Sequence, residues 1–209
     1  MALSWLTMMT TAAGSPAVTL HQGDAFDADA VRSFVRGLDV VVCAYLGDNK
    51  LMVDGQKALS SAPVKPRACP GTSPATWCLD YTKLALGELF PKDPMIHVKA
   101  YLDRKPKVKG VHILVGGFME PQFSSFYGIW DPSTQTLRHW STCDEILEGT
   151  RYENAADFTA AVCADNDAAG VLRYQCPLSG LCASQGAYNY PLGLGTATSV
   201  LAPQATALV

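Results

Sequence analysis

Two continuous runs of apolar residues constrain the fold of this chain more than any other feature. "DVVVCAYLG" covers residues 39–47 and "GVHILVGGFM" covers residues 110–119. Both are rich in β-branched residues, and neither shows the apolar–polar alternation of a strand with one solvated face. Runs of this kind are typical of strands in a parallel sheet that is covered on both faces. We therefore expect both runs to lie in the interior of such a sheet.

Helical patterns alternate with these strands. The stretch "DADAVRSFVRGLD" follows a short expected strand at 17–24, begins at Asp27 as a plausible N-cap and ends near Gly37. Its apolar residues share one helical face: Val31, Phe34, Val35 and Leu38. Residues 48–59 and 93–105 also have helical spacing, and Pro94 stands at an early helical position. The order strand–helix–strand–helix predicts a doubly wound α/β fold.

The rest of the chain divides into a continuation of this domain and a tail. A turn sequence, "DPSTQ", lies between two aromatic stretches and predicts a hairpin within 126–140. A short helix is expected from about Asn154, and "GVLRY" reads as a late strand. Residues 175–209 have almost no charge and no sustained helical face. We predict one domain at 17–174 and an irregular or disordered tail at 175–209.

One internal segment contradicts this architecture. Between Ser60 and Thr76 the chain contains four prolines, at positions 63, 66, 70 and 74. Proline cannot donate a backbone hydrogen bond and is excluded from central strands. We therefore interpret residues 60–76 as aberrant, and expect the sheet either to lose a strand there or to hold a loop in its place.

Composition excludes several classes of function. The formal net charge is −3 and the densest basic stretch is the short "RKPKVKG" at 104–110, which argues against a nucleic-acid partner. The seven Cys form no C-x-x-C pair, so neither a zinc site nor a disulfide framework is indicated, and the cytoplasm is the expected compartment. The start of the chain is mildly apolar but lacks a basic region, and predicts neither a signal peptide nor a membrane span.

The order of these features resembles the NmrA-like family of atypical short-chain dehydrogenases, which are similar to isoflavone reductases and include fungal enzymes of secondary metabolism. The resemblance rests on "VTLHQGDAFDADAVRSFVRGLDVVV", "GQKAL", "PMIHVKAYLDRKPKVKGVHILVGGFME" and "YENAADFTAAVCAD". It implies an incomplete Rossmann-like doubly wound parallel sheet with a small C-terminal substrate-side region. The Gly-rich first βαβ unit of the family is missing, so the resemblance reads as N-terminally truncated.

The resemblance also implies an activity. It predicts an oxidoreductase that uses NADP, or NAD as the alternative, to reduce a small aromatic or polyketide-type metabolite. Two other readings stay open: a non-catalytic NAD(P)-sensing regulator, and an inactive product of a damaged gene. Where residues 60–76 stand, the family has a helix end and a buried strand, so we hypothesise a shifted reading frame or a mis-spliced transcript there and in the tail.

Seven residues are implicated by the resemblance. The expected cofactor-binding residues follow two strands: Asp24 after the first, and Ala44, Tyr45 and Leu46 after the second. The alternatives are a turn or helix-capping role for Asp24 and strand-end packing for the other three.

Lys99 is the expected catalytic residue, because a Lys on the helix before the "GVHILVGGF" strand acts as an acid–base or electrostatic group in the family. A Lys that lies along a half-buried helix with its charge in water is the alternative. Phe118 and Met119 are the expected substrate-binding residues, with core packing as the alternative. No metal is expected.

Overall fold

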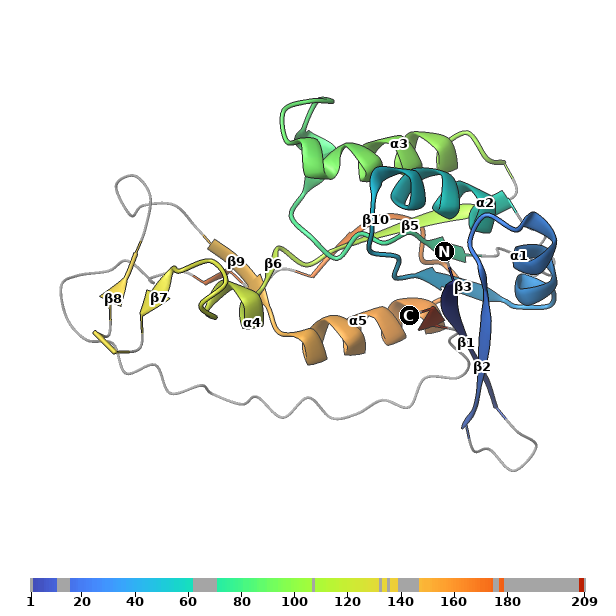
Figure 1. The fold of residues 1–209 in the computed structure, drawn as a ribbon, viewed down its shortest axis with the longest axis horizontal. Coiled ribbons are helices and arrows are strands. Elements are labelled where there is room, and N and C mark those ends of the chain that lie inside the picture. The colour runs from blue at the N-terminus through green and yellow to red at the C-terminus, as the bar shows by residue number, and fades with distance from the viewer. Residues whose placement is uncertain are drawn as a thin grey trace.

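The protein has a mixed α/β architecture built around a parallel sheet (Figure 1). The computed structural model describes residues 2–10, 16–61, 71–106, 108–131, 133–134, 136–138, 147–174, 177–178 and 207–208. The strand order in the main sheet is β10-β5-β4-β3-β12, and all of its pairs are parallel. The bounds of these strands are Val40–Cys43 for β3, Gly71–Ser73 for β4, Lys109–Leu114 for β5, Gly170–Arg173 for β10 and Ala207–Leu208 for β12.

Helices lie on both faces of this sheet. The helices α2 (Gln56–Ser61) and α3 (Asp93–Leu102) lie on one face, and α5 (Tyr152–Ala164) lies on the other (Figure 1). The side chains of β5 alternate between them: Val111 and Ile113 pack in a cluster with Ala155 of α5, whereas Leu114 packs with Tyr81 on the α3 side. Both apolar runs form buried strands of the parallel sheet, as the sequence predicted.

The first predicted strand forms but joins a different sheet. Strand β2 (Pro16–Asp24) pairs antiparallel with β1 (Ala2–Thr10), and together they make a separate two-stranded sheet. Helix α1 (Ala28–Val35) follows, and the carboxylate of Asp27 accepts hydrogen bonds from the backbone N–H groups of Asp29 and Ala30, both at 3.0 Å. Gly37, with φ of +85°, follows the helix end. The predicted N-cap and helix end are therefore confirmed.

The proline-containing segment still supplies a strand. Three of its prolines lie at 63, 66 and 70, outside the described residues, and β4 occupies the three positions between Pro70 and Pro74. The expectation that the sheet lacks a strand here is wrong, because a proline blocks a ladder only at its own position. Pairing stops at Ser73 before Pro74, and a single bridge between Cys78 and Leu114 resumes it.

Short elements complete the fold. A π-helical turn, η1 (Leu51–Gly55), leads into α2, and two 3₁₀ turns, η2 (Tyr81–Lys83) and η3 (Phe90–Lys92), precede α3. Beyond β5 lie β6 (Gly117–Phe118), α4 (Met119–Gln122) and β9 (Leu147–Thr150), and β9 pairs with both β6 and β11 (Pro177–Leu178). The predicted hairpin is formed by β7 (Trp130–Asp131) and β8 (Thr136–Leu137).

The structure also bears on the expected irregular tail and on the expected absence of a membrane span. Within 175–209, predicted to be irregular, residues 177–178 and 207–208 form β11 and β12, and the remainder lies outside the described residues. Among the helices that the structure describes, none combines the length and apolar character needed to span a membrane.

Candidate ligand site at the carboxyl edge of the sheet

The parallel strands end at one common edge, where open α/β sheets bind ligands. Strand β3 ends at Cys43 and β5 ends at Leu114. Because both strands pair in parallel with β4, the residues that follow them emerge at the same edge. Two groups predicted from sequence therefore share this edge: residues 44–46 after β3, and Phe118 with Met119 after β5.

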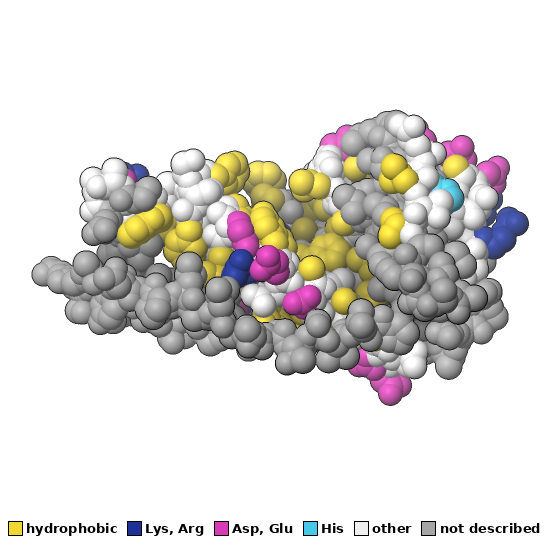
Figure 2. Space-filling view, turned by 90° about the horizontal axis from the view of Figure 1, so that it is seen from below, with side chains coloured by type: hydrophobic (Ala, Val, Ile, Leu, Met, Phe, Trp, Pro, Cys, Tyr) yellow, Lys and Arg dark blue, Asp and Glu magenta, His cyan; other side chains and the backbone are white. Residues whose placement is uncertain are grey.

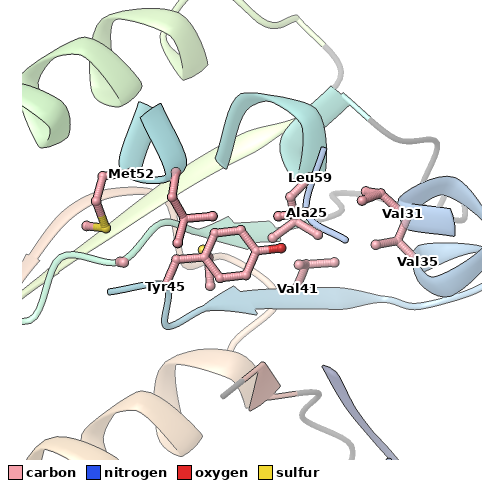
Figure 3. Close-up of a cluster of buried hydrophobic side chains, with 10 residues drawn as sticks. Ala25, Val31, Val35, Val41, Tyr45, Met52 and Leu59 are labelled. Carbon is pink, nitrogen blue, oxygen red and sulfur yellow. The ribbon is translucent and has the colours of Figure 1, made fainter. Parts of the chain in front are cut away.

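The three residues after β3 point in different directions. Tyr45 is only 4% exposed and packs in the main hydrophobic cluster, whereas Leu46 is 89% exposed and Ala44 is also exposed. Figure 3 shows the Tyr45 ring lying over β3 among the core side chains. A Cβ atom added to Gly55 would lie 3.4 Å from this ring. Tyr45 thus supports the edge from beneath, and Ala44 and Leu46 are the residues that a ligand could reach.

Asp24 holds the turn from β2 into α1. Its Oδ1 accepts a hydrogen bond from the backbone N–H of Phe26 at 3.0 Å, and this bond lowers the pKa of the carboxyl. The next residue, Ala25, is fully buried in the core. The structure thus shows a turn role for Asp24, which was the alternative reading, and cofactor contact by Asp24 stays a prediction.

The carboxylate of Asp48 caps the start of η1, the helical turn that follows β3. The backbone N–H of Leu51, the first residue of η1, donates to Asp48 Oδ1 at 2.8 Å. In dinucleotide-binding folds a Gly-rich turn and free N–H groups at a helix start receive the pyrophosphate. No Gly-rich turn of that type occurs among the described residues. This edge therefore offers exposed apolar surface for a ring, and its described part lacks a pyrophosphate cradle.

The substrate-side residues form a junction between β6, β9 and α5. The rings of Phe118 and Tyr152 have centroids 4.5 Å apart, and Tyr152 is 51% exposed. The backbone N–H of Tyr152, at the start of α5, donates to both carboxylate oxygens of Glu120, at 3.0 and 3.2 Å. Met119 begins α4 and is half-buried. Figure 2, seen from the α5 side, shows hydrophobic side chains gathered in the middle of the molecule beside acidic and basic ones.

Gly116, the first of two glycines after β5, is required by this junction. Gly116 has φ of +72°, and a Cβ there would lie 2.7 Å from the Cβ of Glu148. A Cβ on Gly117 would overlap the side-chain amide of Gln122. The positive φ of Gly116 and the nearby Glu148 backbone exclude larger residues there, so Gly116 lets the chain turn sharply from β5 into β6, whereas at Gly117 the flexible Gln122 side chain could move aside.

Lys99 lies away from this edge. It stands in the last turn of α3, and its Nζ pairs with Asp103 Oδ2 at 2.7 Å. Leu102 at the end of the same helix meets Gly110 at the start of β5, where an added Cβ would lie 3.0 Å from Leu102 Cβ. The last turn of α3 is therefore at the amino end of β5. The structure does not bring Lys99 together with Phe118 and Met119, which follow the carboxyl end.

Sequence reasoning missed a buried polar pair on β5. The hydroxyl of Tyr81 and Nδ1 of His112 are 2.8 Å apart, and both residues are at most 1% exposed. Burial lowers the pKa of His112 to about 4, and the positive charge of Lys99 acts in the same direction. Burial also raises the pKa of Tyr81 well above its usual value. A His inside a β-branched run was the available signal for this pair.

Comparisons with family models, curated proteins and solved structures found no match for this chain. In the part of the chain that the structure describes, no three His, Cys, Asp or Glu side chains are grouped to hold a metal ion.

Proposed function

We propose that this chain is an NmrA-like oxidoreductase with an incomplete Rossmann-like sheet. In this proposal NAD(P)H reduces a small aromatic or polyketide-type metabolite at the carboxyl edge of that sheet. The observation that carries it is the shared edge: exposed Leu46 follows β3, and the Phe118–Tyr152 ring pair follows β5. The reaction class rests on the sequence resemblance.

The chemistry of the edge suits an aromatic ligand. Tyr152 exposes half of its surface beside Phe118, so a planar ring could pack against it, and offset or tilted ring pairs are favourable. Leu46 adds an aliphatic surface that suits an adenine or a second ring. Small-molecule sites are usually apolar with a few fixed polar groups, and Glu120, held by the N–H of Tyr152, is such a group.

The test is titration of the purified full chain with NADPH, followed by cofactor fluorescence. Leu46→Asp should weaken binding at least tenfold. Leu20→Asp is the matched control, because Leu20 is also exposed but lies on the separate sheet of β1 and β2. The proposal is refuted if millimolar NADPH does not bind, or if both variants weaken binding equally. Loss of NADPH absorbance with small aromatic ketones and enones then tests turnover.

A non-catalytic regulator that senses NAD(P) is the second candidate. It is favoured by the position of Lys99, whose ammonium pairs with Asp103 at the opposite end of β5 from Phe118. This candidate predicts NADPH binding without turnover and an affinity unchanged in Lys99→Ala. A fall in turnover in Lys99→Ala, with binding preserved, would favour the reductase.

A further inference from the structure

A buried histidine in the middle of β5 joins three elements of the fold: β5, η2 and α3. His112 projects from β5 on the α3 side, next to Tyr81 of η2, and the two side chains are 2.8 Å apart at Nδ1 and the hydroxyl. The rings meet edge to face with centroids 6.3 Å apart. His112 is 1% exposed and Tyr81 is fully buried. The pair therefore lies within the packing of η2 and α3 on β5.

Only one nitrogen of the ring is satisfied. His112 Nε2 is buried and has no hydrogen-bond partner in the portion of the chain that the structure describes. It lies beside the start of β5, where a Cβ on Gly110 would be 3.1 Å from Nε2 and 3.0 Å from Leu102 Cβ. In either neutral tautomer Nδ1 can bond to the Tyr81 hydroxyl, and Nε2 faces apolar surface and backbone. Protonation would place a full charge and a second N–H donor in this site.

The charged groups near the ring act in opposite directions. On α3, Lys99 disfavours a proton on His112, and Asp103 favours it. These two side chains pair with each other at 2.7 Å. On the η2 side, Tyr81 is the direct partner, and Asp80 before it is paired with Arg173 of β10 at 2.8 Å. Cys78 also faces Tyr81, and burial raises the pKa of its thiol, so it stays neutral at moderate pH.

We propose that His112 is an acid-operated switch, in which protonation of the ring opens the packing of η2 and α3 against β5. The Lys99–Asp103 pair sets the pH at which this occurs. The charged ring must reach either water or the carboxylate of Asp103, and in the closed structure it is separated from water by Tyr81 and α3. If the charged ring pairs with the carboxylate of Asp103, Lys99 loses its ion-pair partner. Both outcomes loosen the last turn of α3.

The direction of the pH effect follows from linkage. The pKa of His112 in the closed state, about 4, is below its ordinary value of 6.5. The closed state is therefore fully stabilised above about pH 6.5 and loses stability as pH falls toward 4. Between pH 7 and pH 5 the opening equilibrium should rise about 20-fold for a shift of that size.

The first experiment measures the switch in the full chain. The Cε1–H resonances of the four histidines are followed by NMR against pH, with His112 assigned from the spectrum of His112→Gln. Hydrogen exchange of residues 81–102 is measured at pH 7 and pH 5 and corrected for the intrinsic exchange rate. We expect His112 to titrate at least one unit below its ordinary value of 6.5, and exchange in 81–102 to rise more than tenfold. A His112 resonance that titrates near 6.5, or corrected exchange that does not change, overturns the proposal.

Charge variants test whether the α3 pair sets the midpoint. Lys99→Met should lower the midpoint of opening, because without that repelling charge the ring is protonated more easily in the closed state. Asp103→Asn should raise the midpoint, because it removes an attracting charge. Lys83→Met is the matched control, because Lys83 is 78% exposed and pairs with Asp80 instead. Equal midpoints in Lys99→Met, Asp103→Asn and Lys83→Met would overturn the role of the pair. These variants keep the proposal falsifiable even if His112→Gln does not fold.

Discussion

Gln56 should be one of the most sensitive polar positions in the protein. It is 1% exposed and starts α2, yet its side chain reaches the segment after β4. Its Oε1 accepts from the backbone N–H of Ala75 at 3.0 Å, and its Nε2 donates to the carbonyl of Met52 at 2.7 Å. The residue therefore ties the helical segment after β3 to the chain between β4 and η2, under the carboxyl edge. We predict that Gln56→Met strongly destabilises the fold.

The magnitude follows from the groups left behind. Ala75 is 7% exposed, so its N–H would lose its acceptor in a buried position, which costs about 1–3 kcal/mol. Losing the bond to the Met52 carbonyl costs about 1 kcal/mol more. Methionine has a similar volume, so no large cavity opens. The expected loss is about 2–4 kcal/mol, out of a total stability of about 5–15 kcal/mol for a domain of ordinary stability.

Urea denaturation measures this loss, and a second variant separates its two causes. Gln56→Glu keeps an oxygen for the Ala75 N–H but cannot donate to Met52 when ionised, and it buries a charge. Burial raises the pKa of the introduced carboxyl, so its cost is present at pH 7 and falls as the pH is lowered toward 5, relative to the wild type at the same pH. Gln56→Met should show no such recovery.

Two results would refute this reasoning. A loss below about 0.5 kcal/mol in Gln56→Met, with an unchanged urea m-value, would mean that the Ala75 N–H finds another partner at no cost. A cost in Gln56→Glu that does not depend on pH would mean that the side chain turns out to solvent. Ser60→Ala is a suitable comparison, because the Ser60 hydroxyl bonds back to the Gln56 carbonyl at 2.7 Å within the same helix.

Two further predictions concern the opposite face of the sheet and the thiols. Trp77→Phe should cost about 1 kcal/mol in thermal unfolding, because the indole Nε1 donates to Thr159 Oγ1 at 2.8 Å and links α5 to the sheet. Thr159→Val should cost a similar amount, and the double variant should cost less than the sum of the two. Burial raises the pKa of Cys43 to about 12 and of Cys163 to about 11. Maleimide or iodoacetamide at pH 8 should therefore label the buried Cys43 only after unfolding, and should label the partly exposed Cys163 slowly in the native chain. Peptide mapping by mass spectrometry measures the labelling, and rapid labelling of Cys43 in the native chain would contradict its burial.

Features set by nearby residues were predictable from the sequence. The two buried strands were visible because a parallel sheet covered on both faces needs uninterrupted apolar residues. The start and end of α1 were visible because Asp27 and Gly37 act within one turn of the helix. The hairpin at β7 and β8 followed from its turn, in which Asp131 Oδ1 accepts from the N–H of Ser133 at 3.0 Å.

Features set by the pairing of distant residues could not be predicted from the sequence. Strand β4 forms although prolines flank it, because β3 and β5 supply its partners on either side and three residues suffice. The Tyr81–His112 pair joins residues 31 positions apart, so the sequence shows an unusual His inside an apolar run but not its partner. The partner of β2 is also set by tertiary context, since β1 lies in a stretch that showed no pattern of its own.

The two proposals are linked through the loop that leaves β4. This chain passes the carboxyl edge at Cys78, whose bridge to Leu114 ends the sheet, and then enters η2, where Tyr81 contacts His112. A ligand that binds the edge only in the closed state must therefore oppose acid opening. At ten times its dissociation constant it would add about 1.4 kcal/mol, which equals one pH unit. A ligand that binds the edge should lower the midpoint of His112 opening by that amount. A ligand that binds but leaves the midpoint unchanged would show that the edge and the switch are independent.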